Sequence, residues 1–400
     1  MMQILDTNKE NKIWPLFRLG FRVFFLGGAL FSAGAMLLWL LSLSGFAVLP
    51  GVRNPIWWHA HEMLFGFALA IVAGFVTTAM QNWTGMPGIK SWPLAIVAAL
   101  WLLPRLLMPL RGELNTLVMT LDLLWLPIVA VMLARPILKT KQWRNLFFVP
   151  LFVFFTLLNA LSYYAAVSGN WLLSERVFIT MVLALSALIT VMGGRVFPFF
   201  TARATQTPKI EPIVWLEKLS LVSIWLSVFA WLLLPRSAGA NALLALLLLV
   251  AGTAHLVRLA RWNYKVTVRV PLLWILYLGY LFIPLGLLAL AAALLKMGIT
   301  VSLASHWLTA GAMGAVILGM IARVSLGHSG RPLEITRIMV VAFAFMILAT
   351  LLRTLLPMIA PSMTMQAYHS SAACWIIAYG LFCWVYWPIL SQPRADGHPG

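Results

Sequence analysis

Long runs without a single charged side chain recur along this sequence and constrain its fold more than any other feature. They include residues 23–50, 63–89, 145–173 and 354–393. A helix needs roughly 20 mostly apolar residues to cross a lipid bilayer, and each of these runs is long enough. With 62% hydrophobic and only 10% charged residues, the composition lies outside the range of soluble domains. The sequence therefore predicts an all-α, polytopic membrane protein.

The apolar runs divide into about twelve predicted transmembrane helices. We expect these helices at residues 20–43, 60–81, 91–110, 114–134, 146–168, 176–197, 213–234, 240–259, 271–295, 301–323, 337–356 and 365–390. No stretch has the composition of a soluble domain. Residues 1–400 are thus predicted to form a single integral membrane domain, with a short cytoplasmic N-terminal segment (1–18) and a C-terminal tail (392–400).

The basic residues predict the topology. A net charge of +18 would suit a nucleic-acid-binding protein, but Lys and Arg are spread over short loops between the apolar runs. Roughly three quarters of the 28 basic residues fall in the N-terminal segment and in alternate loops after it, as the positive-inside rule describes for cytoplasmic segments. We therefore predict that both termini are cytoplasmic and that the partner of this charge is the lipid bilayer and not nucleic acid.

Ionisable side chains at membrane depth are costly and are candidates for function by default. On the predicted topology they divide between two leaflets. The outer group comprises His59, His61, Glu62, Asp122, His306 and His369. The inner group comprises Arg195, His255, Arg323 and His328.

His59 and His61 form a His-x-His pair where the second predicted helix begins. On a helix, residues two apart point in nearly opposite directions and cannot share a metal ion, whereas in an extended loop they can. His59 and Met63 are four apart, so on a helix this imidazole and thioether would lie together, and the combination suits copper. Histidines that only cap the helix at the membrane surface are the alternative interpretation.

Small residues follow His306 at four-residue spacing, at Gly311, Ala315 and Gly319. Such a stripe lets a neighbouring helix or a flat cofactor approach the backbone, and helix packing is the commoner cause. His306 is accordingly either a ligand beside such a cofactor or a buried structural histidine.

The remaining candidates each have a structural alternative. His328 lies among glycines and arginines that could pair with cofactor carboxylates or could only anchor a loop. His255 lies near the predicted end of a helix, where a cation interacts favourably with the helix dipole. For Asp122 we rank pairing with an arginine such as Arg105 first, ahead of orienting a metal-bound histidine or serving a proton path. The sequence contains no Walker loop, nucleophile elbow or Cys-x-x-Cys motif, so the ordinary chemistries of soluble enzymes have no support.

Several motifs together carry a specific resemblance over essentially the whole chain. They are Phe17–Phe25, Trp58–Phe67, Asn82–Gly85, Gly194–Pro198, Ala322–Pro332 and Pro393–Gly397. With these motifs the chain resembles the NnrS family of bacterial membrane proteins. Val23 and Gln81 depart from the family pattern, which often has proline at both positions, and neither position could ligate a metal.

The resemblance implies haem and copper as prosthetic groups and a role in nitric oxide and nitrosative stress at the bacterial inner membrane, without an established catalytic reaction. The family's histidines match His59, His61, His306 and His328, with His255 and His369 matching less closely. From the residues and the resemblance together, the predicted cofactor-binding residues are His59, His61, His306, His328 and His255. The predicted metal ligands are His59, His61, Met63 and His306, and the predicted supporting or structural residues are Asp122, Glu62, Arg195 and Arg323.

Three other functions compete with this interpretation. A haem-copper terminal oxidase subunit would need a His-His pair for copper, which the chain lacks. A secondary transporter of a small anion, without haem, would use Arg22, Arg195 and Arg323 as substrate contacts and would be expected to show inverted repeats. A pigment-free scaffold or sensor would not depend on the histidines.

Overall fold

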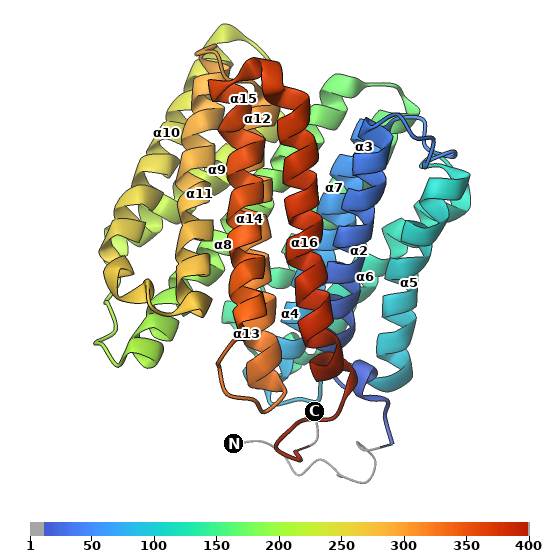
Figure 1. Ribbon diagram of the computed structural model, residues 1–400, viewed down its shortest axis with the longest axis vertical. Helices are drawn as coiled ribbons and strands as arrows, with labels where there is room; N and C mark the ends of the chain where they lie inside the picture. The colour runs from blue at the N-terminus through green and yellow to red at the C-terminus, as the bar shows by residue number, and fades with distance from the viewer. Residues whose placement is uncertain (1–11, 399–400) are drawn as a thin grey trace. The chain divides into compact units, whose positions relative to one another are not determined.

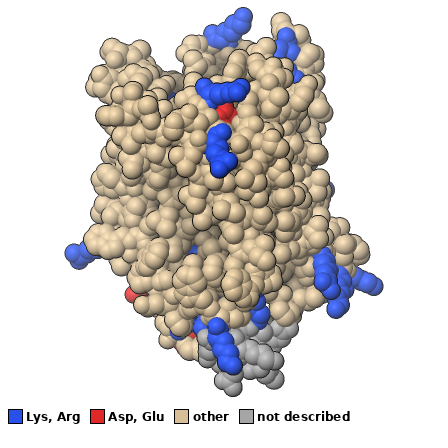
Figure 2. Space-filling view, turned by 90° about the vertical axis from the view of Figure 1, so that its right-hand side faces the viewer, with Lys and Arg blue, Asp and Glu red and all other residues tan. Residues whose placement is uncertain are grey.

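The computed structural model describes residues 12–398, and every regular element in that range is helical (Figure 1). Twelve segments are long and apolar enough to cross a membrane, so the chain is a multi-pass membrane protein. The face presented in Figure 2 shows a broad band without charged side chains, with Lys and Arg above and below it. The predicted twelve-helix, all-α class is confirmed, including the third and eleventh helices, which carry Arg105 and Arg353.

Nine spans are built on one long helix each. The other three are composite, because each consists of two or three consecutive helical segments. The long helices are α2 (Gly20–Leu43), α5 (Ser91–Arg111), α6 (Thr116–Lys139), α7 (Phe148–Val167), α8 (Trp171–Thr205), α9 (Val214–Leu233), α10 (Ala238–Arg261), α11 (Pro271–Leu294) and α16 (Thr364–Ser391). The composite spans are α3 (Pro55–His61) with η2 (Glu62–Ala68) and α4 (Leu69–Thr84), α12 (Val301–His306) with η5 (Trp307–Met313) and α13 (Gly314–His328), and α14 (Arg337–Thr354) with α15 (Leu356–Ile359). Short 3-10 turns precede α2, α7, α11 and α16, at Pro15–Phe17, Trp143–Asn145, Tyr264–Thr267 and Pro361–Met363.

The chain folds into two compact units. Unit 1 comprises Met1–Glu175, Ile321–Glu334 and Tyr379–Gly400, and unit 2 comprises Arg176–Met320 and Ile335–Ala378. Within unit 1, α2 packs along α4, and α6 packs against both α5 and α7. Within unit 2, α10 packs between α9 and α11, and α11 also packs against η5.

A π-helical segment follows a histidine in two of the composite spans. The segment η2 begins directly after His61, and η5 begins directly after His306. Such widened turns are rare, and they are frequent at functional sites because they redirect the side chains around them. Helical periodicity in the sequence does not reveal them.

The stripe of small residues after His306 receives a helix. A Cβ added at Gly311 would lie 2.8 Å from the Cβ of Phe282, and one added at Gly319 would lie 2.8 Å from Ile275. On the opposing helix, a Cβ added at Gly279 would lie 3.1 Å from the Cβ of Ala315. Helix α11 therefore lies directly against this stripe, which is the commoner of the two causes considered from the sequence.

Two predicted helices were several residues too short at both ends. The second was expected at 60–81, but this span runs from Pro55 to Thr84. The sixth helix was expected at 176–197, but α8 runs from Trp171 to Thr205 and includes Pro198 in its interior. Proline removes one backbone hydrogen bond and tends to kink a helix without always ending it. Arg195 and Pro198 therefore lie inside α8 and not at its end.

The close packing of α11 on the stripe yields a stability prediction. We expect Gly311→Ala to destabilise the protein by about 1–3 kcal/mol, because the added methyl group meets the Cβ of Phe282, which cannot swing away. Gly34→Ala is the matched control, since nothing lies within 4 Å of the added atom. Thermal unfolding of both variants in detergent measures the difference, and equal stabilities would contradict the packing described.

Candidate functional site

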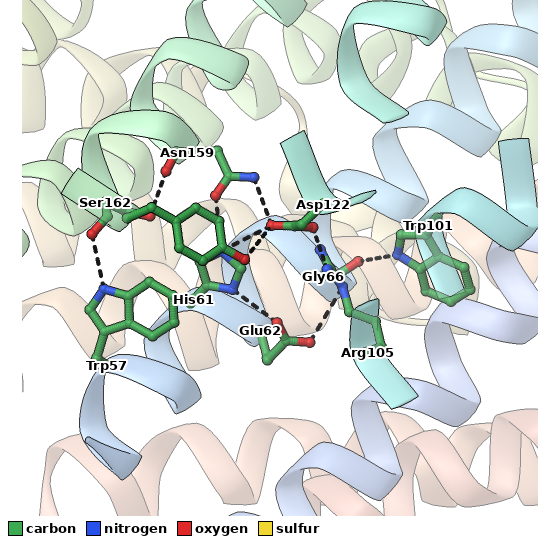
Figure 3. Close-up of polar contacts among 10 residues, drawn as sticks. Trp57, His61, Glu62, Gly66, Trp101, Arg105, Asp122, Asn159 and Ser162 are labelled. Atoms are coloured by element: carbon green, nitrogen blue, oxygen red, sulfur yellow. Dashed lines mark hydrogen bonds and ion pairs between the residues drawn. The ribbon is translucent and has the colours of Figure 1, made fainter. Parts of the chain in front are cut away.

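Four fully buried ionisable side chains lie together inside unit 1. Those of His61, Glu62, Arg105 and Asp122 are 0% exposed, and they converge from three spans (Figure 3). Buried charges are costly unless each is paired and hydrogen-bonded. Together with Asn159 and Tyr163 of α7, we call this cluster the Arg105 network.

The core of the Arg105 network is an ion pair. The guanidinium of Arg105 on α5 contacts the carboxylate of Asp122 on α6, and its Nε also lies 3.3 Å from Glu62 Oε2. The second oxygen of Asp122 accepts hydrogen bonds from the side-chain amide of Asn159 at 2.9 Å and the hydroxyl of Tyr163 at 3.0 Å. The pairing of Asp122 with Arg105 that we ranked first from the sequence is thus present.

His61 has an oxygen partner at each ring nitrogen. Its Nδ1 lies 2.9 Å from Glu62 Oε1, and its Nε2 lies 2.9 Å from Asn159 Oδ1 and 3.2 Å from Asp122 Oδ2. Because Asn159 donates its amide N–H to Asp122, it presents its oxygen to His61. Each of these oxygens can accept a hydrogen bond from the ring, so both ring nitrogens are engaged by polar partners. The network thus brings one arginine and one histidine together with two carboxylates.

The local backbone makes room for this network. A Cβ added at Gly66 in η2 would lie 3.0 Å from Arg105 Nε and 2.8 Å from Phe31, so glycine lets the guanidinium pass. The Gly66 carbonyl accepts a hydrogen bond from Trp101 Nε1 at 2.8 Å. On the other side, the indole of Trp57 stacks on the His61 ring with centroids 4.5 Å apart. Packing therefore holds the ring in one plane.

The two histidines of the His-x-His motif point apart. Both lie in α3, and the His59 ring stacks on Trp39 with centroids 4.5 Å apart, whereas His61 lies in the Arg105 network. The extended geometry that would let them share a metal is not formed, because Asn54 caps α3 and the helix includes both residues. His59 and Met63 remain four residues apart, and both are half-buried.

A second buried network lies in unit 2, around Arg258 of α10. Its guanidinium pairs with Glu217 of α9, with Nε 2.8 Å from Oε1, and its Nη1 donates to the Tyr280 hydroxyl and the Thr190 carbonyl, each at 2.9 Å. The same hydroxyl lies 2.8 Å from His255 Nδ1. His255 is 0% exposed and α10 continues to Arg261. The predicted position at a helix end was therefore wrong, because the basic residues after His255 belong to the same helix.

His328 is the last residue of α13, and the C-terminal tail binds beside it in unit 1. Arg394 Nη1 donates to the His328 carbonyl at 3.0 Å, and the ring of His328 lies 5.5 Å from that of Phe21. Arg394 also pairs with Asp396, and this hydrogen bond holds the pKa of the Asp396 carboxyl well below its usual range. Arg22 Nη1 of α2 donates to three backbone carbonyls at and just beyond the end of α16, those of Ile389, Leu390 and Gln392. The tail is thus held in unit 1 by Arg22 and by its own Arg394.

The other predicted residues divide between the units. His306 and Arg195 are half-buried in unit 2, while Arg323 is buried in unit 1. The metal ligands predicted from the sequence, His59, His61, Met63 and His306, stay a prediction as a set, because His306 belongs to unit 2 and the others belong to unit 1. Within each unit, the described residues contain no three His, Cys, Asp or Glu side chains placed to hold a metal ion.

Sequence reasoning missed the residues that complete both networks. Asn159 and Tyr163 are uncharged, so the charge-based search passed over them, although they stand four apart on one face of α7. Glu217 and Arg258 were not among the predicted residues either. A search for tyrosines and amides inside apolar spans would have found Asn159, Tyr163 and Tyr280.

The Arg105 network should dominate the stability of unit 1. We expect Arg105→Met or Asp122→Leu alone to cost about 3–5 kcal/mol, because each leaves a buried charge without its partner. The double variant R105M/D122L should cost less than either single change. Arg144→Met, at an exposed position, is the control and should change stability by less than about 1 kcal/mol. Unfolding in detergent measures all four, and additive losses in the double variant would contradict the pairing.

A family model described as the NnrS protein matches residues 15–394, which include all twelve spans and both buried networks. No curated protein matches the chain. The matched range contains every motif on which the resemblance was based except the last three residues of Pro393–Gly397, and it fits a membrane protein related to nitric oxide stress. The chain belongs to the NnrS family.

Proposed function

We propose that this protein binds haem and copper in the bacterial inner membrane and acts in resistance to nitric oxide, by binding it or a related ligand or by protecting metal centres from it. The observation that carries the proposal is the family match over residues 15–394 of a chain with twelve apolar spans. We assign no catalytic reaction.

The membrane location suits this chemistry. Nitric oxide is small and nearly apolar, so it dissolves in the bilayer and reaches a metal held between helices without a polar channel. Imidazole ligands suit both iron and copper, and thioether ligands favour copper in its reduced state. Helix bundles commonly bind metals and cofactors through side chains of facing helices, and histidine is a suitable ligand there.

The chain's own residues fit these metals unequally. His59 and Met63 offer an imidazole and a thioether one helical turn apart, which suits copper. His61 does not fit as a ligand, because both ring nitrogens are engaged with oxygen partners. His328 lies beside Arg394 and is a candidate for haem, since guanidinium groups pair well with propionate carboxylates. His255 remains a second candidate.

Spectroscopy of the purified protein tests the proposal. Full-length protein from bacteria supplied with iron and copper should show a Soret absorption band and contain copper by metal analysis, and nitric oxide should shift the band. A colourless, copper-free protein would refute the proposal and favour the transporter of a small anion.

Substitutions separate the ligands from the networks. We expect the double variant H59A/H306A to lose most of its copper, whereas His61→Gln should lower the unfolding temperature and keep the copper content of the folded protein. Metal analysis and thermal unfolding of the same samples measure both quantities. Copper loss in the His61 variant with an unchanged unfolding temperature would reverse the assignment.

A further inference from the structure

We propose that Arg353 binds the phosphate group of a phospholipid at one end of unit 2. At this end α14 finishes and α16 begins, and Figure 1 labels α15 there. Free inorganic phosphate presents the same oxygen atoms, so the test compares the two sources. The site does not depend on the proposed binding of haem or copper, and it includes none of the residues predicted to hold them.

Contacts between α14 and α16 hold Arg353 in place. The residue lies in the last turn of α14. One turn earlier, the Ala349 carbonyl accepts a hydrogen bond from the Ser371 hydroxyl of α16 at 2.8 Å. Further along the same line of contact, the guanidinium carbon of Arg353 lies 3.8 Å from the centre of the Tyr368 ring. The side chain is thus half-buried between two helices and does not extend freely from the end of the unit.

The buried part of this guanidinium has no acceptor for its hydrogens. Among the described residues, Arg353 Nη1 is buried without a hydrogen-bond partner, and the side chain in electrostatic contact with Arg353 is Tyr368. The dipole of α14 favours a cation in its last turn, but no carbonyl of that turn accepts the Nη1 hydrogens. A buried donor without an acceptor is costly, above all when it is charged. We therefore infer that a ligand supplies the missing oxygens.

Other arginines inside the spans show what Arg353 lacks. Arg105 pairs with two carboxylates, and Arg258 pairs with one and also donates to a carbonyl and a hydroxyl. Arg22 donates to three backbone carbonyls. Each of these three guanidinium groups therefore has oxygen atoms from the chain itself beside it, whereas Arg353 has an aromatic ring.

The carboxylates of unit 2 cannot supply these oxygens. They are Glu211 and Glu217. Successive spans alternate in direction, so α9 and α14 run the same way. Glu217 lies in the first turn of α9, at the opposite end from Arg353, and it pairs with Arg258. The described ion pairs do not include Arg353. The anion must therefore be a bound molecule.

The contact with Tyr368 prepares the guanidinium to bind an oxyanion. A separation of 3.8 Å is direct contact between two carbon atoms, so no N–H group fits between the guanidinium carbon and the ring. The group therefore uses its flat face for the ring, and its N–H bonds point outward in its own plane. That fork of donors matches two oxygens of a phosphate group. Because the ring already fixes the fork, less freedom is lost when the ligand binds.

The surroundings favour a lipid as the source of the phosphate. Large apolar side chains are exposed around Arg353, namely Leu348 (44%) and Leu351 (36%) of α14, Ile359 (78%) of α15 and Met365 (47%) of α16. Lipid phosphate groups lie at the edge of the hydrocarbon layer, which is also the level at which a span ends. A phospholipid can thus place its tails against the apolar side chains and its phosphate beside the fork. Basic pockets between transmembrane helices bind lipid head groups in this way.

Replacement of Arg353 tests the site in the full-length protein. Protein freed of lipid in a neutral detergent is titrated with phosphatidylglycerol, and bound lipid is counted by native mass spectrometry. We expect Arg353→Met to bind this lipid at least about tenfold more weakly, because charge-assisted hydrogen bonds are lost. Arg337→Met is the matched control, since it makes the same change at an exposed position in the first turn of the same helix, and it should retain the tight site.

Stability without lipid separates a binding site from a structural role. Methionine can still pack on Tyr368 but removes the unpaired charge, so lipid-free R353M should unfold at the same temperature as the unsubstituted protein or at a higher one. Added phosphatidylglycerol should raise the unfolding temperature of the unsubstituted protein and raise that of R353M much less. A lower unfolding temperature of lipid-free R353M would show that Arg353 has a partner within the protein, and it would overturn the site.

Inorganic phosphate identifies the source of the anion. At constant ionic strength, free phosphate should leave the unfolding temperature unchanged, because it has no tails to contact the apolar side chains. Stabilisation by phosphate through Arg353, without any by phosphatidylglycerol, would overturn the lipid as the ligand. Equal lipid binding by R353M and the unsubstituted protein, or binding by neither, would overturn the site itself. None of these measurements depends on haem or copper, so the proposed function is tested separately.

Discussion

The contact between Arg105 and Asp122 is the constraint on which unit 1 depends. Neither charge can remain in an apolar span alone, so α5 and α6 must keep these side chains together. The pair then determines the neighbours, because the remaining carboxylate oxygen of Asp122 needs donors, and α7 supplies Asn159 and Tyr163. His61 of α3 contacts the same carboxylate. Four spans are thus connected by one buried network.

This arrangement changes the role of the most conspicuous sequence motif. Within Trp58–Phe67, the two histidines are separated by one residue and could share a metal only in an extended loop. The helix directs them to different surroundings. His61 serves the buried network, where every ring nitrogen is engaged. His59 lies against Trp39 and keeps Met63 one turn away. The motif therefore divides into two separate environments, the buried network around His61 and the stacked pair of His59 and Trp39.

Hydropathy predicted the spans because lipid imposes length and polarity on every helix, and the structure has all twelve. The pairing of Asp122 was also predictable, since a carboxylate in an apolar span requires a cation. The π-helical segments were not, because η2 and η5 have the same apolar composition as α-helices. Uncharged partners such as Asn159 and Tyr163 were equally hidden, because only the folded arrangement shows which polar groups meet.

The account rests on a division of labour between two neighbouring histidines, with His61 in a closed network and His59, beside Met63, proposed as a copper ligand. X-ray diffraction from crystals of the isolated protein, with anomalous scattering measured at the copper absorption edge, tests it most directly. We predict an anomalous peak beside His59 and Met63 and none at His61. A copper peak at His61, with Glu62 or Asn159 displaced from its ring, would contradict the account.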